Sequence, residues 1–364
     1  MHQTSVGIVG CGNISGIYLK NLTSYAQTKV AAVADLDLNR AKEKAAEHGV
    51  AKAYSLEEML ADPEIEIVLN LTIPAAHHQV AMQAVNAGKH VYNEKPLTVE
   101  RAEAQELLAL AESKGVRVGC APDTVLGAGT QTARELIDNG EIGDLVSAQG
   151  WMMGSGVETW HPNPVFYYKK GGGPLFDMGP YYLSAFVTLL GPVSRVTGST
   201  KTALKQRVAS SKGNEGLVID VETPTHIHSI IDFAGGAVAQ LTTSFDTMAS
   251  GGYPNIDVYG TKGMIRVPDP NTFGGPVLLK RQGEDDFTEI EVKRPYSENS
   301  RGVGVLDMAL AIQSGRAHRA SGQLAAHLLD VMHAVHEASD LGRHIAPVIA
   351  GVRPEAMPAT ELQA

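Results

Sequence analysis

Short apolar runs alternate with stretches of helical periodicity over the first third of the chain. The runs typical of strands cover residues 6–9, 30–34, 65–71, 90–92 and 116–119. Between them, apolar residues recur at helical spacing over residues 14–25, 38–47, 75–87 and 99–112. Strands that alternate with helices of this length form βαβ units. We therefore predict an α/β domain over residues 1–122, built on a doubly wound parallel sheet that binds its ligand at the carboxyl ends of the strands.

From residue 145 onward the pattern changes to runs in which apolar and polar residues alternate. These runs cover residues 148–153, 193–199, 225–233, 237–245, 255–259 and 264–267. They predict an α+β domain over residues 123–364 with a large, mostly antiparallel sheet that is open on one face. A helical pattern at 322–341 is expected to pack back on the first domain. The tail from Pro354 is expected to be mobile or to dock only on a partner subunit.

Composition narrows the classes of function. The net charge is −10, without blocks of basic residues, so neither nucleic acid nor an anionic membrane is an expected partner. No apolar run reaches membrane-spanning length, and a strand-like pattern at residues 5–9 leaves no room for a signal peptide. Cys11 and Cys120 are too few for a disulfide framework and fit a reducing compartment. These features favour a cytoplasmic protein.

The first predicted strand runs straight into the sequence GCGNIS at residues 10–15. Glycine at 10 permits a tight turn, and Gly12 lets a pyrophosphate approach the backbone. Asn13 and Ile14 open the next helix, whose free N–H groups and dipole favour anions. Ser15 takes the third position of the fingerprint, where a small residue suffices for packing of the helix on the strand. Gly10, Gly12, Asn13 and Ile14 are therefore predicted to bind a dinucleotide.

Asp35 stands at the end of the second predicted strand, about 20 residues beyond the glycines, as the dinucleotide fingerprint requires. A carboxylate there accepts hydrogen bonds from the adenosine ribose hydroxyls and repels a 2′-phosphate. NAD is therefore favoured over NADP, although Arg40 is close enough in sequence to neutralise a phosphate. The alternative is that Asp35 is a turn residue or a helix N-cap, since Asp37 and Asn39 make this loop rich in capping residues.

The third predicted strand ends in a polar loop at the same ligand-binding edge. Thr72 lies where this loop would pass the cofactor ribose, and Pro74 suits the start of the next helix. Of the two histidines that follow, His78 is predicted to reach the cofactor side more than His77. A surface position on the helix is the alternative for either histidine.

The fourth predicted strand is followed by Glu94, Lys95 and Pro96. The proline ring pushes Lys95 out of the helical region into an extended conformation, so the backbone aims its ammonium group. The alternative is that Pro96 only begins the next helix and that Lys95 is solvated. The other motifs of the chain favour a functional lysine.

A second candidate group lies far downstream, in the sequence GGGPLFDMGPYY at residues 171–182. The glycines allow close approach of backbone or ligand, and Pro174 suits the first turn of a helix. Asp177 and Tyr181 are four residues apart, so on a helix both point from one face. The alternative is that Asp177 caps the helix and Tyr181 belongs to the core.

Together these motifs resemble the Gfo/Idh/MocA oxidoreductase family. The resemblance rests on residues 10–13, the strand end at Asp35, residues 72–74 with His78, and residues 88–96. It implies an N-terminal Rossmann domain that binds NAD, with Glu94 and Lys95 beside the cofactor. It also implies that the open face of the second sheet joins subunits into a homodimer or homotetramer.

The family pattern implies that Lys95, Asp177 and Tyr181 surround the reacting hydroxyl or carbonyl group. Removing hydride from a secondary alcohol requires the hydroxyl proton to leave, so a base must lie within hydrogen-bond reach. In one arrangement Tyr181 exchanges the proton, Lys95 lowers its pKa and Asp177 orients Lys95 and the substrate. In the other, Lys95 accepts the proton itself, with its pKa depressed by the nicotinamide charge and by partial burial.

An aromatic segment at residues 160–168 is the candidate substrate loop. It contains Trp160 and His161, which suit stacking on a sugar ring and bonding of its hydroxyls; a hydrophobic lid or subunit contact is the alternative. Asp123, just past the fifth strand, is a further candidate for substrate binding. The resemblance implies a sugar, cyclitol or glycoside. No metal site is expected, because no cysteine or carboxylate cluster joins the histidines of the last helix.

The sequence therefore predicts an NAD-dependent oxidoreductase that transfers hydride between a secondary hydroxyl of a carbohydrate and the nicotinamide. One alternative is a glycoside hydrolase or lyase that retains its NAD and oxidises the sugar ring only transiently. The other is a nucleotide-binding sensor without catalytic activity, which the joint presence of Lys95, Asp177 and Tyr181 disfavours.

Overall fold

The computed structural model describes residues 2–249 and 251–358. Its first domain is built on a six-stranded sheet in the order β3-β2-β1-β4-β5-β6, in which every neighbouring pair is parallel. The strands are β1 Thr4–Val9, β2 Thr28–Ala34, β3 Lys52–Tyr54, β4 Ile67–Asn70, β5 His90–Asn93 and β6 Val118–Cys120. The predicted doubly wound sheet is confirmed. Its strand order reverses between β1 and β4, the point at which such sheets bind ligands.

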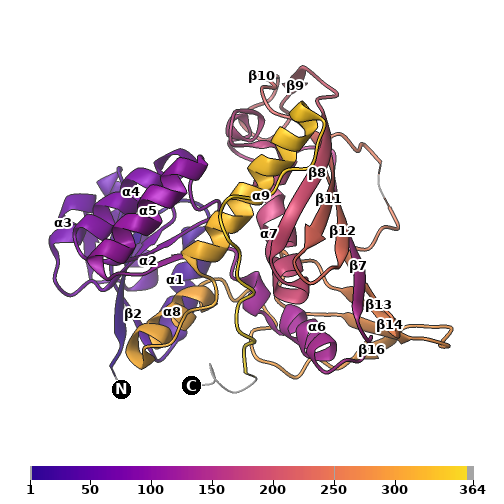
Figure 1. The fold of residues 1–364 in the computed structure, drawn as a ribbon. Helices are drawn as coiled ribbons and strands as arrows, with labels where there is room; N and C mark the ends of the chain where they lie inside the picture. The colour runs from indigo at the N-terminus through magenta and orange to yellow at the C-terminus, as the bar shows by residue number, and fades with distance from the viewer. Residues whose placement is uncertain (1, 250, 359–364) are drawn as a thin grey trace.

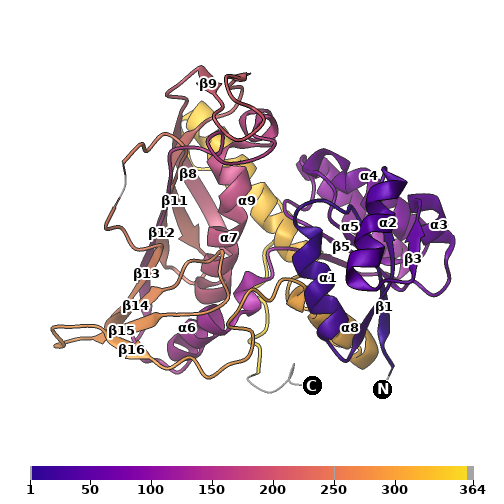
Figure 2. The ribbon, with the colours of Figure 1, turned by 180° about the vertical axis from the view of Figure 1, so that it is seen from behind.

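Helices cover both faces of this sheet (Figures 1 and 2). They are α1 Ser15–Ser24, α2 Leu38–His48, α3 Leu56–Ala61, α4 Pro74–Asn86 and α5 Arg101–Lys114. The sequence pattern missed β3 and α3, because three and six residues are too short to show a period. A local signal for α3 was present, since Ser55 and Glu58 form a capping box at its start.

The second domain is built on an eight-stranded sheet in the order β16-β15-β14-β13-β7-β12-β11-β8. Its strands are β7 Leu145–Met153, β8 Val193–Lys201, β11 His226–Phe233, β12 Val238–Ser244, β13 Ile256–Gly260, β14 Gly263–Val267, β15 Val277–Arg281 and β16 Thr288–Ile290. Neighbours are antiparallel except for β7 and β12. The predicted mostly antiparallel sheet is confirmed.

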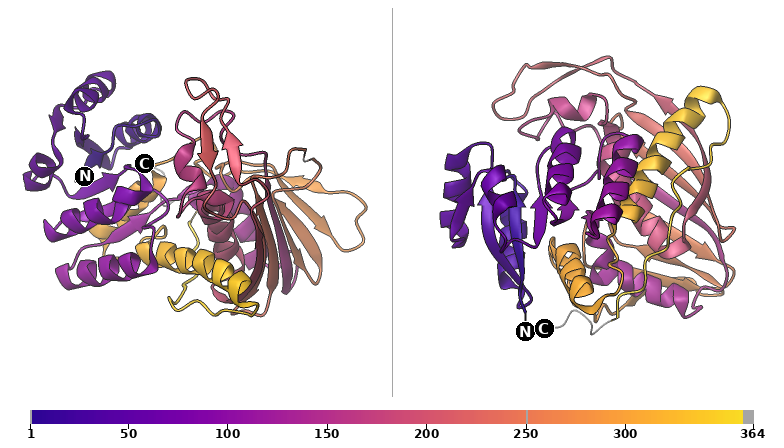
Figure 3. Two further views of the ribbon diagram at one scale, coloured as in Figure 1. Left: turned by 90° about the horizontal axis from the view of Figure 1, so that it is seen from above. Right: turned by 60° about the vertical axis from the view of Figure 1, so that its left-hand side comes forward.

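Helices of the second domain cover one face of this sheet, and the described residues leave the other face without a helix (Figure 3). The α-helices are α6 Ala128–Asp138, α7 Gly173–Leu190, α8 Val303–Ser314 and α9 Gly322–Leu341, and short 3₁₀ turns η1 and η2 cover Thr124–Leu126 and Val165–Tyr168. A small hairpin of β9 Gln206–Val208 and β10 Val218–Asp220 forms a separate sheet. The α7 helix packs on β7, β11 and β12, and α9 packs on β8.

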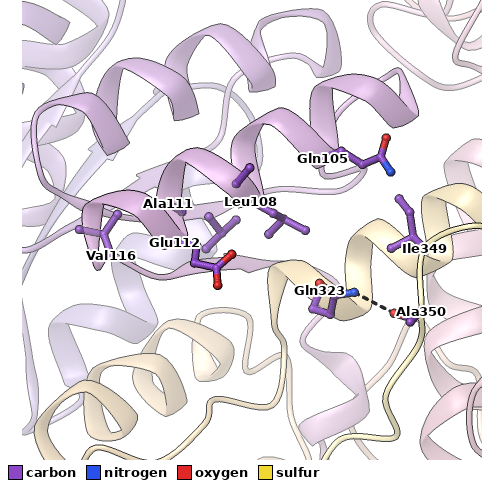
Figure 4. A pocket seen from close by; sticks show the side chains of 10 residues that line it. Gln105, Leu108, Ala111, Glu112, Val116, Gln323, Ile349 and Ala350 are labelled. Carbon is purple, nitrogen blue, oxygen red and sulfur yellow. Dashed lines mark hydrogen bonds between the residues drawn. The ribbon is translucent and has the colours of Figure 1, made fainter.

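The last two helices also pack on the first domain. α8 contacts α1 and β6, and α9 contacts α5 and β6 as well as α7, so α9 runs between the two domains (Figure 1). An open groove lies between α5 and α9, where Gln323 donates to the carbonyl oxygen of Ala350 at 2.8 Å (Figure 4). None of the residues that line this groove belongs to the predicted site.

The expectation for the C-terminal tail was wrong where the structure describes it. The backbone N–H of Met357 donates to Gln131 Oε1 at 2.9 Å, and Arg294 donates to the carbonyl oxygen of Met357 at 2.6 Å. The tail up to residue 358 is thus docked on its own chain. Residues 359–364 lie outside the described residues.

Gly119 on β6 gives a test of how tightly the strands near the site are packed. A Cβ at this position would lie 2.4 Å from the ring of Tyr92, which is fully buried. We expect Gly119→Ala to lower the free energy of unfolding by about 1–3 kcal/mol, the usual cost of overpacking, measured by chemical denaturation. Gly16→Ala is the control: its Cβ would meet no atom within 4 Å on α1, so it should raise that free energy by about 0.5–1 kcal/mol. Equal stability of the two variants would contradict the packing at β6.

Candidate active site

Three buried polar side chains hold the turn that follows β5. At the strand ends, Asn70 Nδ2 donates to Asn93 Oδ1 at 3.0 Å. Asn93 donates to the carbonyl oxygen of Leu97 at 2.9 Å, and His77 Nδ1 lies 2.6 Å from the carbonyl oxygen of Pro96. The turn that presents the predicted catalytic lysine is therefore fixed from inside the domain. The sequence analysis assigned no role to the two asparagines, although an asparagine at the end of each of two apolar strands was a visible signal.

The paired histidines of α4 are placed in the opposite way to the prediction. His77 faces inward, with Nε2 3.0 Å from the carbonyl oxygen of Thr72, and burial lowers its pKa, so the ring is neutral. His78 points toward α5, with Nε2 3.2 Å from Glu106 Oε2. Adjacent helical residues are turned about 100° apart, so the face that α4 buries decides which histidine reaches the Lys95 turn. That residue is His77.

Lys95 is joined to the second domain by an ion pair. Its Nζ lies 2.7 Å from Asp177 Oδ1 and 2.9 Å from the carbonyl oxygen of Asp177, a residue 82 positions further along the chain. The ring centroid of Tyr181, one turn further along α7, is 5.4 Å from the same nitrogen. The Lys95 and Asp177 side chains are only 18% and 14% exposed. The structure thus gathers the three residues predicted to carry the chemistry.

The glycine run before α7 lets the two domains meet here. A Cβ at Gly171, whose φ is +80°, would lie 2.9 Å from Val99 Cγ1 in the first domain. A Cβ at Gly172 would lie 2.6 Å from the carbonyl oxygens of Phe166 and Tyr167. Only glycine permits these approaches. The approach at Gly171 brings the segment before α7 against the first domain, and the approach at Gly172 packs this segment on the preceding loop of its own domain.

The electrostatics of Lys95 differ from the expectation of a depressed pKa. Burial lowers the pKa of its ammonium group, but the charges of Asp177, Tyr181 and Glu94 raise it by more, so the pKa lies above its ordinary value. In the protein alone the neighbouring acids outweigh burial. Lys95 is therefore a cation at neutral pH. Burial raises the pKa of Tyr181, and the cations Lys95 and Arg301 oppose that rise.

The glycine-rich loop after β1 has the shape that a dinucleotide needs. A Cβ at Gly10, where φ is +97°, would lie 2.8 Å from the backbone of Leu71, so this position requires glycine. A Cβ at Gly12 would meet no atom within 4 Å, which leaves room for a pyrophosphate over the start of α1. Ser15 is fully buried, as expected for the small third residue of the fingerprint.

The other residues predicted to contact the cofactor follow β1, β4 and β5, which are neighbours in the sheet. Asn13 is exposed and Ile14 is the N-cap residue of α1. The hydroxyl of Thr72 donates to Asn70 at 2.7 Å, and Pro74 begins α4.

Glu94 connects the end of β5 to the dinucleotide-binding helix. Its Oε1 accepts from the Tyr18 hydroxyl on α1 at 2.8 Å, and its Oε2 accepts from the backbone N–H of Lys95 at 2.8 Å. The residues present therefore fit an NAD molecule that lies across the carboxyl edge of the sheet.

Asp35, which directly follows β2, organises this edge. Its Oδ2 accepts from the backbone N–H of Cys11 at 2.8 Å, and its Oδ1 accepts from the N–H of Asp37 at 2.9 Å. The N-cap of α2 is Asp37 and not Asp35. Arg40 Nη1 lies 3.6 Å from Asp35 Oδ1. The carboxylate is thus held beside the glycine-rich loop, where the ribose of a dinucleotide is bound.

The predicted substrate loop places two rings near the ion pair. His161 Nδ1 accepts from the N–H of Asn163 at 3.0 Å, so the neutral ring carries its proton on Nε2. Burial lowers the pKa of His161, and Asp177 is among the charges that act on it. Tyr167, which belongs to the predicted aromatic segment, meets His161 edge-on at 4.8 Å between centroids. Trp160 is 64% exposed.

Asp123 does not occupy the place that was predicted for it. Its Oδ2 accepts from the backbone N–H groups of Gly302 and Gly304 at 2.8 and 3.0 Å, and the residue is 1% exposed. Burial raises its pKa to about 6. The structure assigns this carboxylate to the turn before α8 and not to a substrate.

Within residues 2–249 and 251–358, no group of three or more His, Cys, Asp or Glu side chains is placed to hold a metal ion. In the same part of the chain, no helix combines the length and the apolar character needed to cross a membrane.

Comparisons with known proteins agree with the geometry. Residues 4–121 match the family model of oxidoreductases with an NAD-binding Rossmann fold, and residues 130–266 match the Gfo/Idh/MocA C-terminal domain. The chain belongs to the Gfo/Idh/MocA oxidoreductase family. Its first domain is an NAD-binding Rossmann domain.

Individual members of the family show the extent of the likeness. Trans-1,2-dihydrobenzene-1,2-diol dehydrogenase of Bos taurus is 31% identical, over 72% of this chain and 74% of its own. The NAD-binding oxidoreductase of Klebsiella pneumoniae has a TM-score of 0.82 at 23% identity, over 95% of this chain and 99% of its own. Levoglucosan dehydrogenase in complex with NADH and levoglucosan has a TM-score of 0.83 at 19% identity, over 95% of this chain and 100% of its own. At these identities the two structures show the shared fold.

Gly12 allows the cofactor edge to be tested without disturbing the fold. Because a Cβ at Gly12 meets no protein atom but enters the space of the pyrophosphate, we expect Gly12→Ala to keep its stability and to bind NADH about tenfold more weakly, a loss of ~1.4 kcal/mol. Fluorescence titration with NADH measures the affinity. Gly235→Ala, in the turn between β11 and β12, is the control and should bind as the unchanged protein does. An unaltered affinity of Gly12→Ala would contradict the placement of the pyrophosphate.

Proposed function

We propose that this protein is an NAD-dependent dehydrogenase that acts on a secondary hydroxyl of a sugar, cyclitol or glycoside. The observation that carries the proposal is the meeting of Lys95 with Asp177 and Tyr181 at the carboxyl edge of the Rossmann sheet. The first domain supplies the predicted cofactor-binding edge and Lys95, and the second domain supplies Asp177 and Tyr181. Such a constellation is suited to proton transfer coupled to hydride transfer.

NAD, when bound, supplies the hydride acceptor or donor. The residues of this chain supply the proton chemistry and the binding. Lys95 remains charged, because Asp177 lies 2.7 Å from its Nζ and stabilises the ammonium form. A charged lysine donates hydrogen bonds but accepts no proton. Tyr181 is therefore the group that exchanges the proton of the substrate hydroxyl, and Lys95 binds the same oxygen while Asp177 orients the lysine.

The substrate class is supported by the loop at residues 160–168. His161 presents an Nε2–H donor and Tyr167 a hydroxyl beside aromatic faces, a combination that suits a ring with several hydroxyls. The Bos taurus relative is named for a diol of a six-membered ring, and one related structure holds levoglucosan. All of these observations are consistent with a cyclic substrate that carries a secondary hydroxyl.

The proposal is tested by following NADH absorbance with a panel of sugars, inositols and aryl glucosides, each with NAD and with NADP. We expect NADH formation with at least one cyclic polyol, and a preference for NAD because the Asp35 carboxylate repels a 2′-phosphate. NAD carried through purification, together with glycoside cleavage and no net NADH release, would contradict a dehydrogenase. Binding of NAD without turnover of any compound would also count against it.

Lys95→Met tests the assigned chemistry directly. We expect it to bind NADH as the unchanged protein does and to lose about 10²–10⁴-fold in turnover, the usual range for acid–base and polar assistance. Steady-state kinetics and NADH titration separate the two effects. Lys170→Met is the matched control, because Lys170 pairs with Glu100 at 2.7 Å at an exposed site near the same glycine run. Wild-type turnover in Lys95→Met would refute the assignment.

We propose in addition that the open face of the eight-stranded sheet joins two copies of the chain. Ile230 on β11 and Val238 on β12 are large apolar residues that are 48% and 40% exposed, and apolar residues on an open sheet favour burial against a partner. We expect a dimer or tetramer in light scattering and a smaller species for Ile230→Glu with Val238→Glu. A monomeric unchanged protein would contradict this assembly.

A further inference from the structure

The hairpin of β9 and β10 stands outside both main sheets, in the chain between β8 and β11 (Figure 1). Its connecting loop is bonded to the candidate substrate loop and to the residues just before it. The backbone N–H groups of Ser210 and Ser211 donate to the carbonyl oxygen of Glu158 at 3.0 and 3.1 Å. Asn214 Nδ2 donates to the carbonyl oxygen of Pro162 at 3.0 Å. The hairpin therefore packs on the loop that is expected to bind the substrate.

Arg207 on β9 is the buried centre of this contact, with a side chain that is 2% exposed. Its Nη1 donates to Glu158 Oε1 at 2.8 Å and to the carbonyl oxygen of Ser155 at 3.0 Å. Its Nη2 donates to the carbonyl oxygen of Phe245 at 2.8 Å and to the carboxylate of Asp246. Arginine suits such a place because its planar group donates several hydrogen bonds in fixed directions. The guanidinium group thus joins the residues before the substrate loop to those that follow β12.

The two ends of the substrate loop meet at Glu158. The hydroxyl of Tyr168, the last residue of η2, donates to Glu158 Oε2 and accepts from the backbone N–H of Val157 at 3.3 Å. Tyr168 is fully buried, and its ring centroid lies 5.5 Å from Arg207 Cζ. The loop is therefore closed at its base by buried polar groups. Trp160, in contrast, is 64% exposed, so its position depends on this base.

The end of the loop also contacts the helix that carries two of the candidate catalytic residues. The backbone N–H of Gly172, one residue before α7, donates to the carbonyl oxygen of Lys169 at 2.9 Å, and η2 contacts α7. The α7 helix carries Asp177 and Tyr181. A loop that is fixed at its base therefore holds its rings in a set place relative to these two residues.

We propose that Arg207 is a positioning residue for substrate binding. Together with its two carboxylate partners, it fixes the loop that presents Trp160 and His161 to the substrate. This inference rests on the proposed function and deepens it, since it assigns the control of substrate affinity to the β9–β10 hairpin. In the described part of the chain, the hydrogen bonds of the Arg207 guanidinium group go to the residues before the substrate loop and to those that follow β12. Loss of Arg207 therefore weakens substrate binding and leaves the chemical step unchanged.

The experiment measures KM, kcat and the affinity for NADH in Arg207→Met and Arg207→Lys. Steady-state rates are followed with NAD and the compound that is oxidised fastest in the NADH panel. For Arg207→Met we expect KM to rise about 5–100-fold, the effect of losing two hydrogen bonds to the substrate, with kcat and the dissociation constant of NADH unchanged. This pattern marks the loss of binding that ground state and transition state share. Arg207→Lys should restore part of the affinity, because it keeps the charge between the two carboxylates.

Asn214→Ala tests the same contact without disturbing buried charges. Arg207→Met leaves two carboxylates buried without their cation, which also lowers the stability of the fold. Asn214 is half-buried, and its replacement removes only the side-chain bonds to the carbonyl oxygen of Pro162 and to Ser211 Oγ. We expect KM to rise about 2–10-fold in this variant, the effect of losing one hydrogen bond.

Gln206→Ala is the matched control in the same hairpin. Gln206 is exposed on β9, and its side chain donates to Asp220 Oδ1 on the neighbouring strand at 2.9 Å. This variant should leave KM unchanged. A purely structural effect of any variant lowers the fraction of active protein, and with it kcat, but does not move KM. The ratio of the two constants therefore separates positioning of the loop from damage to the fold.

A second readout needs no substrate. Trp151 and Trp160 are the two tryptophans of the chain, so in the Trp151→Phe background the fluorescence anisotropy reports on Trp160 alone. We expect Arg207→Met and Asn214→Ala to lower this anisotropy, because the loop is released at its base, and Gln206→Ala to leave it unchanged.

The two readouts together decide the inference. An unmoved KM in folded Arg207→Met and Asn214→Ala would overturn it, whether the anisotropy of Trp160 falls or not. A raised KM with a lower anisotropy supports it. If no compound of the panel is oxidised while the anisotropy falls, the proposed function is what fails, and the anchoring of the loop by Arg207 stands.

Discussion

The ion pair between Lys95 and Asp177 is the interaction on which the arrangement of this protein depends. Two charges that are less than one-fifth exposed are costly to bury, and only a short, well-aimed contact offsets that cost. On one side, buried asparagines and His77 fix the turn that carries Lys95. On the other side, the glycines before α7 allow Asp177 to approach the lysine. Removing either charge would leave the other buried and unpaired. The packing of the two domains and the geometry of the candidate site are therefore one constraint.

This constraint also fixes the charge state of the site. A lysine beside a carboxylate stays protonated, so under the proposed function the proton moves through the neighbouring phenol of Tyr181. Burial alone would make Tyr181 a poor base, because it disfavours the phenolate. The positive charges of Lys95 and Arg301 oppose that effect on the pKa of Tyr181. The division of tasks proposed for Lys95, Asp177 and Tyr181 thus follows from burial and charge together.

The route of the chain explains why the two domains are in such close contact. After the large sheet is complete, the chain returns to pack α8 against α1 and β6 and to run α9 between the domains. The loop before α8 is bonded to both α1 and Asp123, because Asn21 donates to the carbonyl oxygen of Arg301 and Asp123 accepts from the N–H of Gly302. The helix that follows the glycine-rich loop is therefore bonded directly to the second domain. The domain boundary at residue 122 divides the sequence, but in the folded protein helices from beyond it pack on the first domain.

The sequence by itself determined the elements and the motifs whose signals are local. Strand and helix periods, the glycines at 10 and 12, the carboxylate at Asp35 and the spacing of Asp177 and Tyr181 depend on residues a few positions apart. Tertiary structure alone decided that His77 and not His78 faces the lysine turn, that Asp123 holds a loop, and that the pKa of Lys95 is raised. Each of these depends on partners distant in the chain or on the face that a helix buries. No local pattern encodes such contacts, because packing selects them only after the elements have formed.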